Sequence, residues 1–284
     1  MTIAQSPRLR LSPFVRRTAG LTAPILVLLC AFFVVPVLML LSRSVTEPSL
    51  GLQNYATLFG TPTYARIFFN TFFVSGLVTA ITLAIAFPLA WGLTVFPRSV
   101  ARILFGLLLL SMWTNLLART YAWMVLLQRT GMINRVLLDL GLIDQPLELV
   151  NNLTGVTIGM VYIMLPFMVM PLYGVLSKLD PSILQAAALC GASRAQALTR
   201  VLWPLARPGV ASGALMVFVM SLGYFVTPAL LGGTANMMLA ELIAQQVQSL
   251  VNWGMGGALA LVLLVVTLAL YALQVRFANA EGGR

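Results

Sequence analysis

The sequence has very few charged residues and no histidine. Only 8% of its 284 residues are Asp, Glu, Lys or Arg, whereas 60% are hydrophobic, and the mean hydropathy is +0.96. Because a soluble domain carries about 25% charged residues to keep its surface hydrated, a water-soluble globule is excluded. Most of the surface of this chain must therefore face lipid.

The missing residue types also exclude several kinds of chemistry. Without histidine, and with only Cys30 and Cys190, the chain has no His/Cys cluster for zinc, haem or iron–sulfur ligation, so we expect both thiols to be inert apolar side chains. No glycine run precedes the single lysine, Lys178, so there is no phosphate-binding loop for ATP. The usual Ser/His or Cys/His pairs and the Gly-x-Ser-x-Gly elbow are missing too. We therefore predict a protein that is not an enzyme, with no catalytic residues, no metal site and no cofactor of its own.

Long apolar runs dominate the rest of the sequence. They lack the alternation of barrel strands, and the first is too long for the core of a signal peptide, so we expect it to be retained. Because only helices and closed barrels satisfy the backbone in lipid, the sequence predicts an all-α membrane protein with six transmembrane helices. The predicted domain spans 21–277, between an N-terminal segment 1–20 and a tail 278–284. Its helices are expected at about 21–42, 69–95, 103–127, 155–177, 209–232 and 254–275.

The charges divide unequally between the two sides of these helices. With six spans both termini lie on one side, and that side carries 12 of the 17 basic residues and two of the seven acidic residues, hence the whole net charge of +10. Basic loops face the cytoplasm, so we predict a multi-pass membrane protein with both termini in the cytoplasm. The basic charge is then explained by topology and anionic lipid rather than by nucleic acid.

The longest predicted cytoplasmic connection inside the bundle, residues 178–208, carries strong local signals. Asp180 followed by proline is typical of a helix start, and the alanine-rich segment 182–189 favours a helix. Gly191 is placed to end that helix. These signals predict the first half of a cytoplasmic helix-turn-helix elbow.

The second half of the elbow begins at a capping box. Ser193 and Gln196 have the required spacing, and they predict a second short helix that ends near Pro204. The exposed face of the elbow is predicted to consist of small side chains, which allow another protein to approach the backbone closely: Ala186, Ala187, Ala188 and Ala192.

The same loop resembles the EAA loop of permease subunits in binding-protein-dependent ABC importers. The matching pattern is Gln-Ala-Ala, then Gly191 after three residues, then Val-x-Trp-Pro after nine more. The chain departs from the family at two positions, Gln185, where the family has glutamate, and Trp203, where it has leucine. The resemblance implies a coupling loop that docks on a cytoplasmic ATPase, and the lost carboxylate removes an ionic contact there. The residues assigned to this role are Gln185, Ala186, Ala187, Gly191, Ala192 and Pro204.

The resemblance covers nearly the whole chain. Asn54-Tyr55, Arg119-Thr-Tyr-Ala-Trp123 and Phe225-Val-Thr-Pro-Ala-Leu-Leu-Gly-Gly233 resemble the spermidine/putrescine permeases. This implies a type I ABC importer fold in the bacterial inner membrane and a translocation pathway for a polyamine or a related amino compound. It also implies two copies of an ATPase subunit that bind ATP and Mg, a second permease subunit and a periplasmic solute-binding protein.

The residues that contact the solute are less clearly marked, because no predicted span contains Asp or Glu. Arg119, the one charge within a span, serves either the pore or the outer interface, where its side chain can snorkel. Aromatic residues either anchor the helices at the interface or bind ammonium groups through their ring faces. The candidates for the pathway are Trp113, Arg119, Tyr121, Trp123, Tyr224 and Phe225.

Two predicted periplasmic segments are candidates for contact with a binding protein. The amphipathic segment 239–250, with Glu241, lies either on the membrane surface or under the docked protein. The loop 128–153 holds Asp139, Asp144 and Glu148. The alternative to an ABC permease is a stand-alone secondary transporter or channel, although the spans lack the acidic or histidine relay typical of proton coupling.

Overall fold

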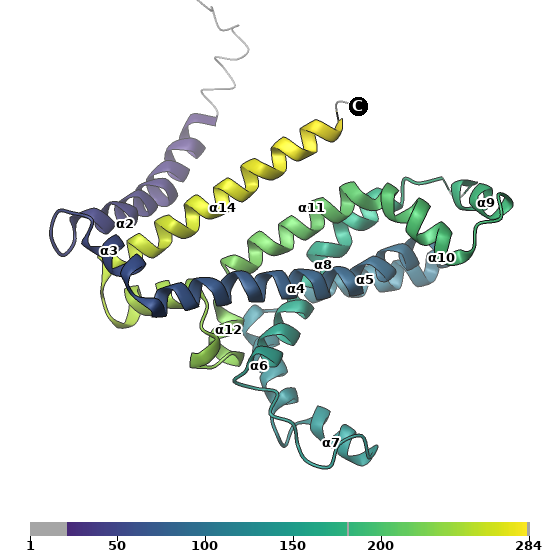
Figure 1. Ribbon diagram of the computed structural model, residues 1–284, viewed down its shortest axis with the longest axis horizontal. Coiled ribbons are helices and arrows are strands. Elements are labelled where there is room, and N and C mark those ends of the chain that lie inside the picture. The colour runs from purple at the N-terminus through teal and green to yellow at the C-terminus, as the bar shows by residue number, and fades with distance from the viewer. Residues whose placement is uncertain (1–21, 181, 283–284) are drawn as a thin grey trace, which may run out of the picture.

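The computed structural model describes residues 22–180 and 182–282, and every regular element in these ranges is helical (Figure 1). The predicted N-terminal segment 1–20 and the proline at 181 lie outside the described residues. In chain order the elements are η1 (Cys30–Val34), α2 (Val35–Thr46), α3 (Gln53–Gly60), α4 (Pro62–Val95), α5 (Arg98–Trp113), α6 (Leu116–Leu127), α7 (Met132–Asp139), α8 (Leu153–Leu176), α9 (Ser182–Leu189), α10 (Arg194–Gln196), η2 (Ala197–Leu202), α11 (Trp203–Leu222), α12 (Val226–Leu231), η3 (Thr234–Asn236), α13 (Leu239–Ala244), η4 (Gln245–Ser249) and α14 (Trp253–Gly282).

The long helices form a membrane-type bundle. Within the described ranges five helices are long and apolar enough to cross a membrane, and a sixth span results if the bent pair of α5 with α6 and α7 is counted as one. The first of the five is a single helix, Thr22–Thr46, that contains η1 and α2. The last, α14, continues to Gly282, so the helix extends into the predicted tail 278–284.

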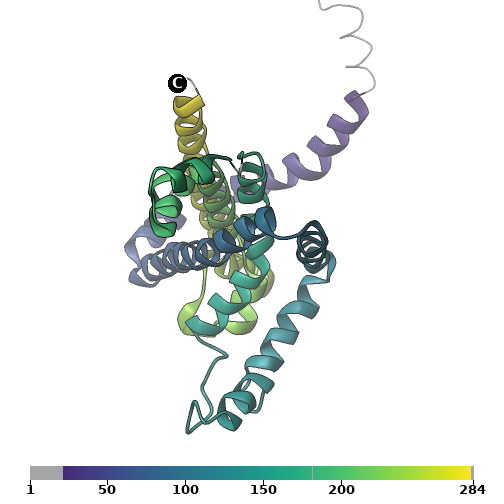
Figure 2. The same ribbon diagram turned by 90° about the vertical axis from the view of Figure 1, so that its right-hand side faces the viewer.

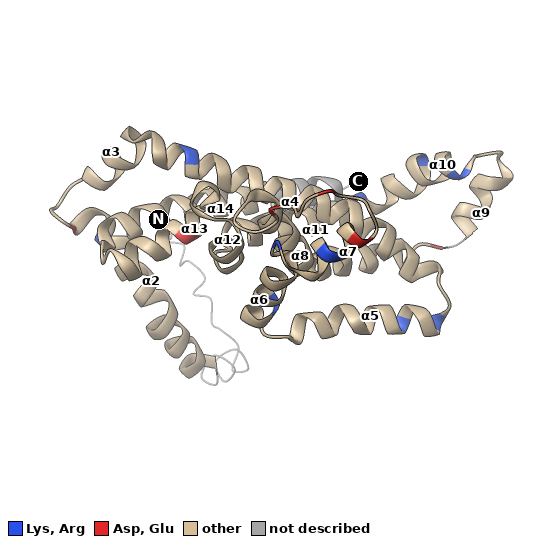
Figure 3. Ribbon diagram, turned by 90° about the horizontal axis from the view of Figure 1, so that it is seen from below, with Lys and Arg blue, Asp and Glu red and all other residues tan. Residues whose placement is uncertain are grey.

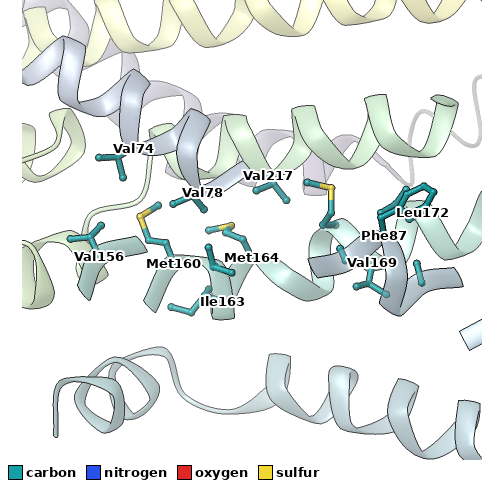
Figure 4. Close-up of a cluster of buried hydrophobic side chains, with 14 of the residues drawn as sticks. Val74, Val78, Phe87, Val156, Met160, Ile163, Met164, Val169, Leu172 and Val217 are labelled. Atoms are coloured by element: carbon teal, nitrogen blue, oxygen red, sulfur yellow. The ribbon is translucent and has the colours of Figure 1, made fainter. Parts of the chain in front are cut away.

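The helix α8 is the centre of the bundle. Its residues Met160, Met164 and Met168 follow one another at one-turn intervals and are fully buried. They lie between α4 and α11, which contribute Val74, Val78 and Val217 to the same cluster (Figure 4). Because lipid tails are as apolar as these side chains, close packing rather than exclusion from water holds the three helices together.

Glycines allow the closest helix contacts of α11 and α14. A Cβ atom at Gly213 of α11 would lie 2.9 Å from the sulfur of Met168 in α8. At Gly257 of α14 it would lie 2.4 Å from the carbonyl oxygen of Leu40 in α2. Since only a residue without Cβ fits such contacts, both glycines act in packing.

The predicted third span, 103–127, is divided into two helices. The helix α5 ends at Trp113, and α6 begins at Leu116 after a bend of 103° between the two parts. Asn115 causes the new start, because its side-chain oxygen accepts hydrogen bonds from the backbone N–H groups of Leu117, at 2.8 Å, and Ala118, at 3.3 Å. The prediction of one continuous helix was therefore wrong, since a single N-cap residue interrupts an otherwise apolar run.

The predicted fifth span, 209–232, is also altered. Its helix begins earlier, at Arg194 of the elbow, and runs without a break to Leu222. The shorter helix α12 follows after three residues and packs against α6 and α8. The second helix of the elbow is therefore the start of a membrane helix and not a separate short one.

The two ends of the bundle differ in charge. The helices α9 and α10 and the C-terminal end of α14 lie toward one end, and α3 and α12 toward the other (Figure 1). Lys and Arg occur on α5 and α10 at the first end, whereas α7 carries residues of both signs and α13 an acidic one (Figure 3). Seen from the side, α2 diverges from the bundle and α6 with α7 projects away from it (Figure 2).

Candidate coupling elbow and translocation residues

The first helix of the elbow, α9, has complete caps at both ends. The carboxylate of Asp180 accepts a hydrogen bond of 2.9 Å from the N–H of Ser182, and this bond lowers the pKa of Asp180. At the other end Gly191 has φ +82°, and its N–H donates to the carbonyl of Ala188 while the N–H of Ala192 donates to that of Ala187, both at 3.0 Å. This is a Schellman ending, which confirms the stop predicted at Gly191.

The second helix of the elbow starts at the predicted capping box. The N–H of Ser193 donates to the side-chain oxygen of Gln196 at 2.9 Å, and the N–H of Gln196 donates to the Ser193 hydroxyl at 3.3 Å. The helix then passes through the π-turn η2, where the N–H of Trp203 donates to the carbonyl of Leu198, five residues back. The prediction that it ends near Pro204 was wrong, because the hydrogen-bond register shifts just before the proline and the helix continues.

The elbow presents a surface of small side chains to solvent. Among the predicted coupling residues, Gln185, Ala186 and Gly191 are exposed, whereas Ala187, Ala192 and Pro204 are half-buried. Sequence reasoning missed Leu189, which is 90% exposed at the end of α9. The position of Leu189 directly before the helix stop could have indicated this exposure, because the C-terminal residues of a short helix lie at its tip.

The elbow is anchored to the bundle by aromatic packing. The ring centre of Trp203, one of the two residues that differ from the family pattern, lies 5.2 Å from that of Phe87 in α4. A cleft of about 420 Å³ separates α9 from the ends of α4 and α8, with Trp91, Leu176 and Leu184 among its walls. The indole thus contacts the helix that forms the core with α8, which gives the elbow a direct contact with the membrane part.

The predicted pathway residues fall into three groups. Arg119 on α6 and Tyr224 after α11 interact electrostatically, and α6 and α12 are joined there by the hydroxyls of Thr120 and Thr227, 3.4 Å apart. Trp123 instead packs against Tyr162, with ring centres 5.5 Å apart. The remaining three, Trp113, Tyr121 and Phe225, are exposed.

Arg119 itself is half-buried, and its Nε atom is buried with no hydrogen-bond partner among the described residues. A buried guanidinium N–H without an acceptor is costly, so this group is poised to bind an acceptor that the isolated chain does not supply.

The segment with Glu241 packs against the bundle through the apolar residues of α13. Leu239 and Leu242 are buried against a cluster that includes Leu58 and Leu259, and the N–H of Leu239 donates to the Thr71 hydroxyl at 2.8 Å. The rest of the chain thus covers the apolar face of α13. The position of 239–250 on the membrane surface or under a docked binding protein stays a prediction.

Glu241 has an unusual environment as a result. Burial raises the pKa of this carboxyl above its ordinary value, and a hydrogen bond from the backbone of Met238 opposes the shift in part. The atom Oε2 is buried with no hydrogen-bond partner among the described residues. A carboxylate in this position attracts a cation or a hydrogen-bond donor, because its second oxygen lost water without gaining a contact.

The loop 128–153 is ordered by one buried amide. The Asn134 side chain donates to the carbonyls of Gln128 and Leu147 and accepts from the N–H of Leu147, at 3.0, 3.0 and 2.8 Å. An ion pair between Arg129 and Glu148 closes the same loop. Among the described residues no group of three or more His, Cys, Asp and Glu side chains is placed to hold a metal ion.

Comparison with known proteins assigns this architecture to a family. The family described as binding-protein-dependent transport system inner membrane component matches residues 97–280, which include the elbow, α6, α12 and α14. The chain belongs to this family. It is a permease of an ABC importer, and the family name places its members in the inner membrane.

Individual relatives agree with this assignment. The permease is 37% identical over 215 residues to the spermidine/putrescine transport system permease protein PotB of Escherichia coli (strain K12), a match that covers 76% of this chain and 78% of the relative. It is 33% identical over 242 residues to the inner membrane ABC transporter permease protein YdcU of the same organism, covering 81% and 76%.

A solved structure shares the fold. In the crystal structure of a bacterial alginate ABC transporter in complex with alginate pentasaccharide-bound periplasmic protein, the matching chain has a TM-score of 0.74 and 19% identity, covering 95% of this permease and 96% of that chain. At this identity the likeness shows the fold alone, and it confirms the predicted all-α permease class.

Proposed function

We propose that this permease forms the translocation pathway for a polyamine of the spermidine/putrescine type, or a closely related amino compound, delivered by a periplasmic binding protein. The observation that carries the proposal is the 37% identity to a spermidine/putrescine permease over three quarters of the chain. ATP and Mg bind to two copies of an ATPase subunit, and a second permease subunit completes the pathway.

In this proposal the elbow transmits ATP hydrolysis to the membrane part. Its docking surface consists of Gln185, Ala186, Gly191 and the exposed Leu189, and its cytoplasmic position agrees with the excess of basic residues at that end. The uninterrupted helix from Arg194 to Leu222 supports this role, because a displaced elbow moves a whole membrane helix with it.

Co-purification tests the assembly. The permease is extracted in mild detergent from its native membrane, and all retained proteins are identified by mass spectrometry. We expect an ATPase and a second permease, and we expect the associated binding protein to bind spermidine or putrescine in calorimetry. Purification of the chain alone or as a homo-oligomer, under conditions that preserve other ABC importers, would instead support an autonomous transporter.

Glu241 is the group best suited to an ammonium ion on the predicted periplasmic side. Replacing it by Gln keeps an oxygen for the Met238 N–H and removes the charge, so the fold should remain intact. We expect Glu241→Gln to lower spermidine uptake at subsaturating concentration by about tenfold, the effect of losing roughly 1.5 kcal/mol of a charge-assisted contact. Radiolabelled uptake by intact cells measures it.

The control for Glu241→Gln is Asp144→Asn. Asp144 carries the same charge on the same predicted side but is exposed. Equal losses in the two variants, or full uptake by Glu241→Gln, would contradict a specific role of the buried carboxylate.

A further inference from the structure

A basic cleft lies at the elbow end of the bundle, between the C-terminal ends of α4 and α8 and the first turns of α5. Its volume is about 630 Å³, and its walls include Arg98, Arg102, Thr94, Ser177, Phe105 and Tyr173. Phe105 of α5 and Tyr173 of α8 form its floor, with ring centres 5.4 Å apart. No carboxylate is among the described residues that line it.

The two arginines of the cleft have unneutralised charges. They are four residues apart on α5, so they occupy the same face of the helix one turn apart, and both are exposed. The ion pairs found among the described residues are Arg43 with Glu47 and Arg129 with Glu148, and neither includes Arg98 or Arg102. The positive end of the 16-residue helix α5 adds to their field. Two guanidinium groups with nearby hydroxyls are the donor set that binds phosphate.

A separate apolar groove lies further along the same two helices. It has a volume of about 560 Å³, and α4 contributes Leu77, Ile81 and Ile85 to it while α8 contributes Tyr162 and Leu165. In α8, Tyr162 and Tyr173 are eleven residues apart and lie on the same face, which places them about 16 Å apart along the axis. This is close to the roughly 15 Å depth of one leaflet of the hydrocarbon core.

The first turns of α5 border the cleft, where Ala101 and Phe105 are among its walls. The same two residues, with Leu104 and Leu108, pack against the core that α4 and α8 form. The apolar groove further along is lined by α4, α6 and α8.

We propose that the cleft and the groove together bind one anionic phospholipid. The phosphate contacts Arg98 and Arg102, and an acyl chain extends between α4 and α8 toward Ile81. The cationic cleft explains the preference for a negative headgroup, and the apolar groove explains why the ligand is a lipid rather than a free phosphate. The bound headgroup joins the first turns of α5 to the adjacent ends of α4 and α8.

The test uses the intact transporter complex in nanodiscs of phosphatidylcholine, with or without phosphatidylglycerol. We expect native mass spectrometry to show phosphatidylglycerol retained by the wild type. In the double variant Arg98→Gln/Arg102→Gln the affinity for phosphatidylglycerol should fall about 30-fold, because the loss of each arginine lowers it roughly fivefold. The matched control Lys178→Gln/Arg207→Gln removes two positive charges from the same end of the bundle and should retain the lipid.

A second variant and a soluble probe distinguish the source of the phosphate. Ile85→Trp fills the apolar groove without changing any charge, and we expect it to lower lipid retention while the arginines remain. Inorganic phosphate, added to the complex in phosphatidylcholine nanodiscs, should not raise the thermal stability as phosphatidylglycerol does. Equal losses of bound lipid in the two double variants would overturn the proposal. It would also be overturned if inorganic phosphate stabilised the complex while Ile85→Trp retained the lipid, or if another subunit occupied the cleft.

Discussion

Gly191→Arg is expected to abolish solute uptake while membrane insertion is unchanged. Gly191 is exposed at the tip of the elbow, and no heavy atom lies within 4 Å of the position that its Cβ would take. The arginine side chain therefore projects from the surface proposed to dock on the ATPase. Its positive φ also costs a residue with a Cβ about 1–2 kcal/mol, which favours a different path of the chain between α9 and α10.

Uptake by cells and the amount of ATPase recovered with the purified permease measure this effect. A matched control is Gly141→Arg, because Gly141 also has a positive φ, +66°, and open space around its Cβ position, but lies in the loop after α7. We expect the control to transport and to retain the ATPase. Wild-type uptake by Gly191→Arg would refute a coupling role of the elbow.

Gly257→Leu is expected to separate α2 from α14 and to prevent assembly of a stable permease. The added Cβ would lie 2.4 Å from the carbonyl oxygen of Leu40 and 3.2 Å from the N–H nitrogen of Ser44, both backbone atoms that cannot rotate away. Overpacking of this kind costs about 1–3 kcal/mol or more. This contact with α14 is the main packing of α2, because most of the other side chains of α2 are exposed.

Thermal unfolding in detergent measures this second prediction, and Gly106→Leu is its control. Gly106 is also a helical glycine of an apolar segment, but no heavy atom lies within 4 Å of its Cβ position. Both variants add the same side chain, so a lower Tm for Gly257→Leu alone would report the contact between α2 and α14. Equal Tm values for the two variants would show that α2 does not depend on this contact.

The membrane class and the number of apolar segments were predictable, because apolar content reports contact with lipid directly. Helix continuity was not, since it depends on single residues within the runs. Asn115 is one polar residue in a long apolar stretch, yet its side chain starts a new helix and turns the chain by 103°. Pro204 had the opposite effect, because a π-turn before it accommodates the ring and the helix continues.

The same distinction applies to the candidate site. The helix stop at Gly191 and the capping box at Ser193 involve neighbours in the sequence, and both were predicted in full. The contact of Trp203 with Phe87 and the buried oxygen of Glu241 depend on residues far apart in the chain. One sequence contains no signal for such contacts.

The continuous helix from Arg194 to Leu222 is a mechanical lever. Its 29 residues extend over about 43 Å at roughly 1.5 Å per residue, so a tilt of about 5° at the elbow displaces the far end by about 4 Å. That end lies next to Tyr224 and α12, which packs against α6 near Arg119. A small rotation imposed on one side of the membrane thus becomes a side-chain-sized movement on the other.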